Sequence, residues 1–246
     1  MGNRSFENFG YVSEKSSDYT VSASRYLHQK KFEKKILQNI KSYLKFKKGE
    51  KILDIGCNVG THFVPLFKSG QNIFGTDHKK CLNVIKKRIP KVSKKRLISG
   101  NFLKIKFKHK FDKIICYSVL HYLSNEKELI FFVNKIISIL KKDGVALLGD
   151  IPNKNLENSF YNSSYGKKWM KKFNYERKKN QIKKKKESIS QYLRNVKKDN
   201  VLIKINDKVI DRLIKFILKK NVLVKRKKQS RNSAFGPTRE DLVLSK

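Results

Sequence analysis

The sequence has few cysteines, few acidic residues and no long apolar run. Its three cysteines, Cys57, Cys81 and Cys116, show no metal-ligand spacing and leave an odd one, so neither a disulfide framework nor a metal site is expected. No stretch approaches the roughly 18 continuous apolar residues of a membrane span. The N-terminus lacks the basic-then-apolar pattern of a signal peptide. We therefore expect a soluble, cytoplasmic protein with no membrane span.

Acidic residues are outnumbered. The chain of 246 residues has 20 Asp and Glu against 59 Lys and Arg, a net charge of +39, which favours an anionic partner such as RNA, DNA or anionic lipid. However, the excess consists mostly of lysine rather than arginine, the residue preferred for bidentate phosphate and base contacts. It is also spread through almost every expected element. A compositional drift toward lysine would give the same numbers, and we favour it, with RNA kept as a possible partner.

The order of apolar segments predicts one α/β domain, because 39% hydrophobic residues in a chain of this length can bury a full core. Strands alternate with helices, which implies a Rossmann-like, doubly wound sheet of seven mostly parallel strands. Strands are predicted at 51–55, 72–76, 96–99, 111–116, 145–149, 222–227 and 241–244. Helices are predicted at 30–45, 61–68, around 82–85, from a capping box at Asn125 and Glu128 to a stop at Gly144, and at 207–220.

The stretch KILDIGCNVGTHF, residues 51–63, places a glycine-flanked turn directly after the first strand. Gly56 and Gly60 let the backbone pass close under a ligand, and the helix that follows offers free N–H groups. A P-loop would need Gly-Lys-Ser/Thr, and a dinucleotide turn needs G-x-G-x-x-G; neither is present. A nucleoside without phosphate fits better, because Asp77, about 20 residues on, can accept hydrogen bonds from ribose hydroxyls.

Four motifs in this order, LDIGCNVG, GTD, GNF and FDKIICYSVLHYL, resemble class I S-adenosylmethionine-dependent methyltransferases of the methyltransferase domain type 11/12 kind, over residues 30–150. The resemblance implies S-adenosylmethionine as cofactor, bound at the turn and at the ends of the next strands. It departs at Asn58, where many members have glycine, but asparagine tolerates a left-handed backbone. The implied cofactor-binding residues are Asp54, Gly56, Cys57, Asn58, Gly60, Asp77, His78, Asn101, Phe102 and Tyr117.

Within that set, Asp77 would hold the ribose, His78 would lie against the adenine, and Asn101 would face the adenine amino group. His78 and Asn101 can equally serve ordinary turn chemistry. The expected division of the chain is an N-terminal segment covering the site (1–29), a cofactor-binding core (30–151), a Lys- and aromatic-rich insertion that forms a lid (152–206), and a closing helix with two strands of the same domain (207–246).

The acceptor is less clearly encoded. GDIPN and the terminal TREDLVL are similar to methyltransferases of bacterial surface-glycan gene sets, which implies a small polar acceptor such as a sugar or nucleotide-sugar hydroxyl. A hydroxyl acceptor is helped by a base. His121, just after the fourth predicted strand, and Asp150, at the end of the fifth, are the catalytic candidates, although either could have a structural role.

Two other functions stay open. GKKWMKKFNYERKKNQIKKKK, residues 166–186, interleaves lysines with Trp169, Phe173 and Tyr175, which could stack on exposed bases of RNA. An RNA or protein methyltransferase is therefore an alternative. A non-catalytic cofactor-binding subunit is a second alternative, against which the intact acids Asp54 and Asp77 argue.

Overall fold

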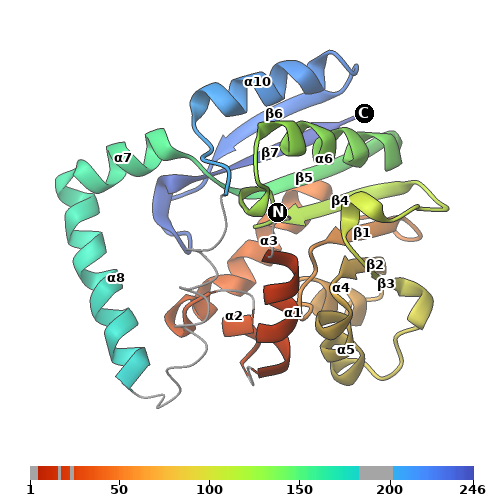
Figure 1. Cartoon of the computed structure of the whole chain (residues 1–246), viewed down its shortest axis with the longest axis horizontal. Helices are drawn as coiled ribbons and strands as arrows, with labels where there is room; N and C mark the ends of the chain where they lie inside the picture. The colour runs from red at the N-terminus through yellow and green to blue at the C-terminus, as the bar shows by residue number, and fades with distance from the viewer. Residues whose placement is uncertain (1–4, 16–17, 23–24, 183–201) are drawn as a thin grey trace.

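A seven-stranded sheet organises the computed structural model, which describes residues 5–15, 18–22, 25–182 and 202–246 (Figure 1). The strand order is β3-β2-β1-β4-β5-β7-β6, with β7 antiparallel to both of its neighbours. The strands are β1 Lys51–Ile55, β2 Asn72–Asp77, β3 Leu97–Ser99, β4 Phe111–Tyr117, β5 Leu140–Pro152, β6 Leu223–Lys228 and β7 Arg239–Ser245. The predicted doubly wound, mostly parallel fold is confirmed.

Helices cover both faces of the sheet (Figure 1). The α-helices described are α1 Ser5–Lys15, α2 Tyr19–Ser22, α3 Glu33–Leu44, α4 Phe63–Lys68, α5 Lys79–Arg88, α6 Glu126–Ile139, α7 Lys154–Asn162, α8 Ser164–Ile182 and α10 Asp207–Leu218. Short 3-10 helices are η1 Leu27–Phe32, η2 Lys94–Arg96, η3 Phe102–Lys104, η4 Leu120–Tyr122 and η5 Gly236–Thr238. None of these described helices has the length and apolar character needed to cross a bilayer.

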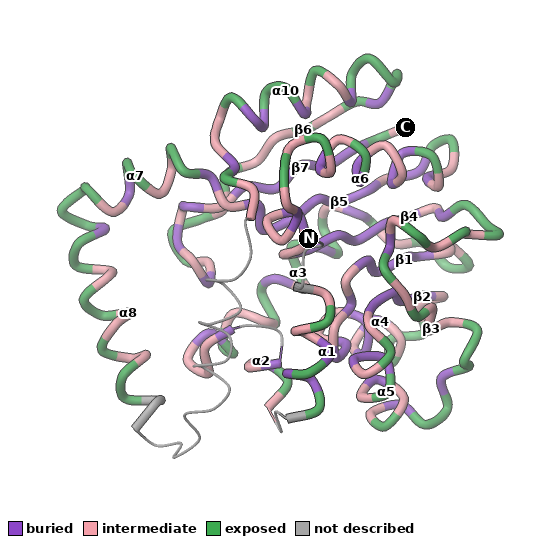
Figure 2. Tube along the Cα trace, in the orientation of Figure 1, coloured by how far each residue is buried: buried purple, intermediate pink, exposed green. Residues whose placement is uncertain are grey.

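Apolar side chains form one core on each face. On one face α6 and α10 pack against the sheet through residues such as Leu129, Ile136 and Leu213. On the other, α3, α4 and α5 contribute Ile40, Leu66 and Ile85 among others. Figure 2 shows the central strands as the most continuously buried part of the chain. This agrees with the near-continuous apolar runs expected of parallel strands that are covered on both faces.

The prediction that Gly144 stops a helix was wrong. Helix α6 ends at Ile139, and β5 begins at once with the buried Leu140, whose backbone is extended (φ −79°, ψ 133°). Gly144 lies inside β5, after Asp143 in a left-handed conformation (φ 62°). The polar run 141–143 reads as a loop, but the chain end holds it in the sheet, since Asp143 N donates to the Lys246 carbonyl over 2.7 Å.

The predicted capping box at the start of α6 is present with one partner changed. The Asn125 side chain accepts from Glu128 N over 2.9 Å, as expected. The Glu128 carboxylate, however, accepts from Ser124 N over 2.6 Å rather than from Asn125 N. The cap therefore also orders the residue before the helix, next to the loop that follows β4.

The predicted lid, 152–206, begins as a pair of helices, α7 and α8, and resumes at residue 202; residues 183–201 of that prediction lie outside the described part. Two aromatic residues of α8, Trp169 and Phe173, pack against other rings. Trp169 and Phe173 stack with ring centroids 4.8 Å apart, and Phe173 lies edge-on to Tyr26 (5.5 Å) and His28 (4.9 Å). The hairpin is thus held against η1 and the residue preceding it. Whether it acts as a lid stays a prediction.

Candidate active site

The glycine turn after β1 is fixed by the end of β2. Gly56 N and Cys57 N both donate to the carbonyl oxygen of Thr76, over 2.9 and 3.3 Å. Gly56 has φ 69°, and a Cβ there would come 2.6 Å from Val119 Cγ2, so any side chain would push the turn away from the loop after β4. Asn58 is left-handed too (φ 48°), in keeping with the tolerance of asparagine for that region. The turn therefore needs glycine at 56.

Asp77 joins this turn directly. Its Oδ2 accepts from Asn58 N over 2.7 Å and its Oδ1 from His78 N over 2.6 Å. Burial raises the pKa of Asp77, and these two backbone N–H groups act in the opposite direction. Because each carboxylate oxygen has two lone pairs, both oxygens can still accept from a ligand.

Asp54 lies beneath the turn and is 1% exposed. Burial raises its pKa well above the ordinary value, and the charge of Asp77 adds to this. Its Oδ2 has no hydrogen-bond partner. A buried carboxylate of this kind is stabilised in its charged form only by a positive partner or by hydrogen-bond donors.

A cavity of about 190 Å³ opens beside the turn at the carboxyl ends of β1, β2 and β4. Doubly wound sheets bind ligands at this edge. Seven of the ten predicted cofactor residues line the cavity: Gly56, Cys57, Asn58, Asp77, Asn101, Phe102 and Tyr117. Helix α1 contributes Phe6 and Phe9 to the opposite wall. One connected space therefore gathers residues from four separate motifs.

The other three predicted residues lie behind the wall. Gly60 faces the core, where a Cβ would meet Val64 and Ile85 at 2.7 and 3.0 Å. His78 caps α5 by accepting from Lys80 N over 3.2 Å, and its Nε2 lies 2.9 Å from a Glu7 carboxylate oxygen on α1. The third is Asp54. In this structure His78 thus performs turn chemistry, with α1 packed over it.

Asn101 also performs turn chemistry while lining the cavity. It caps η3, and its side-chain oxygen accepts from Leu103 N over 3.0 Å. A carbonyl oxygen has a second lone pair, so this contact leaves Asn101 able to accept one more hydrogen bond.

Several polar side chains of the cavity were not predicted from the sequence. Arg25 Nη1, Thr61 Oγ1, His62 Nε2 and Thr76 Oγ1 are buried at its wall with no hydrogen-bond partner. Burial, with the Arg25 charge adding, lowers the pKa of His62 to about 3, so its imidazole is neutral. Thr61 and His62 directly follow Gly60, a position that could have signalled them. Nothing in the local sequence marks Arg25.

Neither catalytic candidate lines the cavity, but each contacts a residue that does. The Asp150 carboxylate, 4% exposed, accepts from the hydroxyl of Ser118, which does line the cavity, and its Oδ2 is 4.0 Å from Arg25 Nη2. Ser118 and Asp150 are both left-handed, φ 60° and 57°. His121, on η4, packs against the lining residue Tyr122 with centroids 4.2 Å apart. Their catalytic roles stay predictions.

Comparison with known proteins identifies the domain. The model of the methyltransferase domain family matches residues 53–148, which span the glycine turn, Asp77 and the end of β4. Residues 53–148 of the chain are a methyltransferase domain. The resemblance drawn from the motifs of the sequence is thereby confirmed. No curated protein matches this chain.

Solved methyltransferases share the fold of the whole chain. The magnesium protoporphyrin IX methyltransferase of Synechocystis, with bound S-adenosylhomocysteine, is 13% identical and covers 98% of this chain and 94% of its own, with a TM-score of 0.60. The N-methyltransferase NodS of Bradyrhizobium japonicum is also 13% identical. Its match covers 99% of this chain and 97% of NodS, with a TM-score of 0.60. Phosphoethanolamine N-methyltransferase 1 of Haemonchus contortus is 13% identical. Its match covers 100% of this chain and 50% of that enzyme, with a TM-score of 0.64. At this identity the likeness extends to the fold alone.

The described residues contain no group of three or more histidine, cysteine or acidic side chains that could hold a metal ion. The three cysteines are free and buried.

Proposed function

We propose that this methyltransferase binds S-adenosylmethionine in the cavity beside the glycine turn and methylates a small polar acceptor, a sugar or nucleotide-sugar hydroxyl. One observation carries the cofactor assignment. Asp77, buried at the end of β2, is held by Asn58 N of the turn and keeps lone pairs free toward the cavity. A carboxylate so placed can accept hydrogen bonds from both ribose hydroxyls.

The unpartnered polar atoms fit the rest of the cofactor. Arg25 Nη1 and the neutral His62 can donate to its carboxylate, and the Asp54 carboxylate, which lies behind the wall, can balance the charge of its ammonium without contacting it. Apolar rings of Phe6, Phe9 and Phe102 suit the adenine. When bound, the cofactor supplies an activated sulfonium methyl group, so the protein's main task is to hold the acceptor in line and exclude water.

The acceptor side lies at the ends of β4 and β5. Ser118 lines the cavity and donates to Asp150, so a proton on the acceptor can reach the Asp150 carboxylate through the Ser118 hydroxyl. Arg25 Nη2 lies 4.0 Å from the Asp150 carboxylate. This arrangement supports Asp150 as the base over His121. The solved relatives named for protoporphyrin and phosphoethanolamine act on small molecules, which also supports a small acceptor.

The test is transfer of label from a labelled methyl donor into fractionated pools of nucleotide sugars, RNA and protein. We expect label in the nucleotide-sugar pool. We further expect Asp150→Asn to lower turnover by about 100-fold, the usual contribution of a general base, at unchanged cofactor affinity. His121→Gln is the comparison: a larger loss there than in Asp150→Asn would reverse the assignment. Label in protein or RNA alone would contradict the acceptor class.

A second function, RNA methylation, is favoured by the outer face of α8. Lys168, Lys171, Lys172, Lys178 and Lys179 are exposed, and Tyr175, 64% exposed, lies among them. These positions recur every three or four residues, so they share one side of the helix. Lysines with a free aromatic ring suit a single-stranded nucleic acid. The other two aromatic residues proposed for base stacking, Trp169 and Phe173, already pack on each other.

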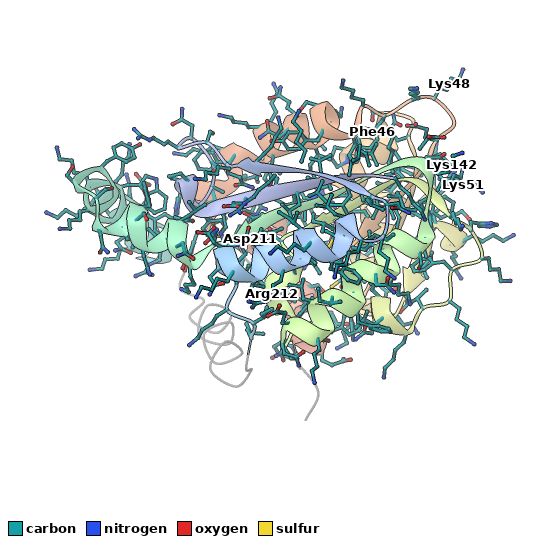
Figure 3. All side chains as sticks on the ribbon, turned by 90° about the horizontal axis from the view of Figure 1, so that it is seen from above. Phe46, Lys48, Lys51, Lys142, Asp211 and Arg212 are labelled. Carbon is teal, nitrogen blue, oxygen red and sulfur yellow. The ribbon has the colours of Figure 1, made fainter. Side chains whose placement is uncertain are left out.

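Against this second function, the basic charge is not confined to α8. Figure 3 shows Lys48, Lys51 and Lys142 at the opposite end of the molecule from α7 and α8. Three charge reversals on α8, Lys168→Glu, Lys172→Glu and Lys179→Glu, should be compared with three on exposed lysines elsewhere, Lys34→Glu, Lys41→Glu and Lys48→Glu. If the charge is drift, both variants bind a labelled RNA oligonucleotide equally weakly at about 200 mM salt. Tight wild-type binding that only the α8 variant loses would favour RNA.

The third alternative, a non-catalytic cofactor-binding subunit, is separated from both by the same transfer assay. Cofactor binding without transfer to any pool would support it.

A further inference from the structure

Two acidic side chains line the cavity beside the glycine turn. Among the described residues of its wall, the carboxylates are those of Asp77 and Glu128. Asp77 is assigned to the ribose, whereas Glu128, on the first turn of α6, has no part in the proposed function. A carboxylate that a bound ligand shields from water costs free energy unless a hydrogen-bond donor of the ligand replaces the water. Glu128 therefore calls for a donor on the cofactor.

The wall around Glu128 is formed by α6 and η3 together. Phe132, one helical turn after Glu128, also lines the cavity, and its ring centroid lies 4.6 Å from that of the lining residue Phe102. Lys135 Nζ, farther along α6, donates to the Leu103 carbonyl over 2.8 Å. These contacts fix η3 against α6, so that Glu128 and Phe102 belong to one side of the cavity.

This side of the cavity is where the base of a bound nucleoside lies. At the end of β2, Asp77 pairs with Ser99 of β3, and Gly100 N donates to the Asp77 carbonyl over 3.1 Å, so the chain leads directly from the ribose acid to η3. Arg25 instead donates to the Ser118 hydroxyl after β4, over 3.4 Å, on the other side of β2 in the strand order. A cofactor with its ribose at Asp77 and its tail toward Arg25 therefore places its base beside η3 and α6.

The Glu128 carboxylate is bonded to the loop beside the cavity. In a complete capping box it would accept from Asn125 N. Instead its Oε2 accepts from Ser124 N over 2.6 Å, and Ser124 follows Leu123, another residue of the cavity wall. Because a carboxylate has about four positions at which it can accept a hydrogen bond, this contact leaves Glu128 able to accept from a ligand.

We propose that Glu128 accepts a hydrogen bond from the 6-amino group of the cofactor's adenine and makes the site selective for that group. This rests on the proposed function, since it concerns the same cofactor. The amino group is the hydrogen-bond donor of the adenine base. Asn101, to which the resemblance assigned this group, is neutral, and its side-chain oxygen already accepts from Leu103 N over 3.0 Å. A hydrogen bond to a charged acceptor is about twice as strong as one to a neutral acceptor.

The test compares S-adenosylhomocysteine with its analogue in which purine replaces adenine, so that the 6-amino group alone is missing. Calorimetry with the full chain gives the dissociation constant of each compound. We expect S-adenosylhomocysteine to bind about tenfold more tightly than the analogue, as one charge-assisted hydrogen bond provides. Equal dissociation constants would overturn this proposal and leave the proposed function standing. No binding of S-adenosylhomocysteine would refute both.

Variants locate the contact through the ratio of the two dissociation constants, because damage to the helix cap alone would weaken both compounds equally. Glu128→Ala should lower the ratio to about one. Glu128→Gln, which can still accept from Ser124 N, should lower it to about threefold, since a neutral acceptor remains. Glu126→Ala is the matched control and should keep the ratio at about ten, because Glu126 lies on the same turn but pairs with Arg212. An unchanged ratio in both Glu128 variants, or an equal fall in Glu126→Ala, would contradict the assignment.

Discussion

The backbone nitrogen of Asn58 donates to Oδ2 of Asp77 over 2.7 Å. This bond joins the turn after β1 to the acid at the end of β2, so the two motifs form one unit although 19 positions separate them. Asn58 has a left-handed backbone (φ 48°), and both Asn58 and Asp77 line the cavity. The unit holds the acid in place before any ligand arrives.

Replacing Asp77 should therefore abolish cofactor binding. A hydrogen bond to a charged group is worth about 1.5–3 kcal/mol, so losing two in Asp77→Ala weakens binding at least about 100-fold. Calorimetry with S-adenosylhomocysteine measures this, and circular dichroism checks that the variant folds. Asp112→Ala is the control, because Asp112 sits at the start of β4 and pairs with Lys141. Unchanged affinity in Asp77→Ala would remove the ribose assignment.

Arg25 should contribute to cofactor affinity through the carboxylate. Arg25→Gln removes one charge-assisted contact, for which we expect about tenfold weaker binding of S-adenosylmethionine and S-adenosylhomocysteine alike, since both have the carboxylate. Arg96→Gln, whose guanidinium bonds Asn72 at the start of β2, serves as the matched control. If Arg25→Gln binds both compounds as the wild type does, the carboxylate is held elsewhere.

Helix α1 should govern access through Gly10. A Cβ at this position would come 2.2 Å from His78 Nδ1, so Gly10→Ala must shift the His78 ring or α1, which carries Phe6 and Phe9 of the cavity wall. We expect cofactor affinity to fall about tenfold, or about 1.4 kcal/mol, although alanine is the better helix former. Glu14→Ala, which removes an exposed pair with Lys80, should have little effect. Wild-type affinity in Gly10→Ala would show that α1 does not shape the site.

Asp241 should make stability depend on pH. It is 3% exposed, and burial, with neighbouring charges adding, raises its pKa to about 6. In the unfolded chain the pKa of Asp241 is about 4, so below pH 4 this side chain is protonated in both the folded and the unfolded state. The stability that its raised pKa contributes to the folded state is then fully present. Between about pH 4 and 6 the folded state holds more protons than the unfolded state. The free energy of unfolding therefore falls as pH rises, by up to about 3 kcal/mol.

Asp241→Asn isolates this contribution. The amide oxygen can still accept from Asp150 N and Gln229, the partners of Oδ1. Denaturant unfolding from pH 4 to 7 should show the wild type losing stability relative to the variant as pH rises. Asp54 and Asp77, whose pKa values are also raised, act in the same direction in both proteins and cancel in the difference. Parallel curves would mean that Asp241 titrates normally.

Local pattern predicted much of the fold. The strand at 51–55 was placed at its observed bounds, because a short apolar run is bounded there by a polar segment and a glycine turn. The cavity residues that were predicted come from turns directly after strands, where topology alone brings them to one edge. The prediction that Gly144 ends a helix failed because the polar run before it has the sequence of a loop. In the structure that run belongs to β5, and a hydrogen bond to the last residue of the chain holds it there.

The residues that were missed depend on contacts distant in sequence. Arg25 reaches Ser118, 93 positions away, and Gln29 reaches Ala234, 205 positions away. No periodicity or motif encodes such pairs. The packing of Trp169 and Phe173 onto η1 was hidden in the same way, since an exposed aromatic residue and a packed one have the same letters. Tyr175 shows that both occur on a single helix.

The most direct test of the account is a calorimetric titration of the purified protein with S-adenosylhomocysteine, NAD and ATP in turn. The account predicts that S-adenosylhomocysteine binds at a single site and that NAD and ATP do not, because the turn has neither the G-x-G-x-x-G nor the Gly-Lys-Ser/Thr pattern that binds their phosphates. Tighter binding of either phosphate-bearing nucleotide, or no binding of S-adenosylhomocysteine, would contradict it.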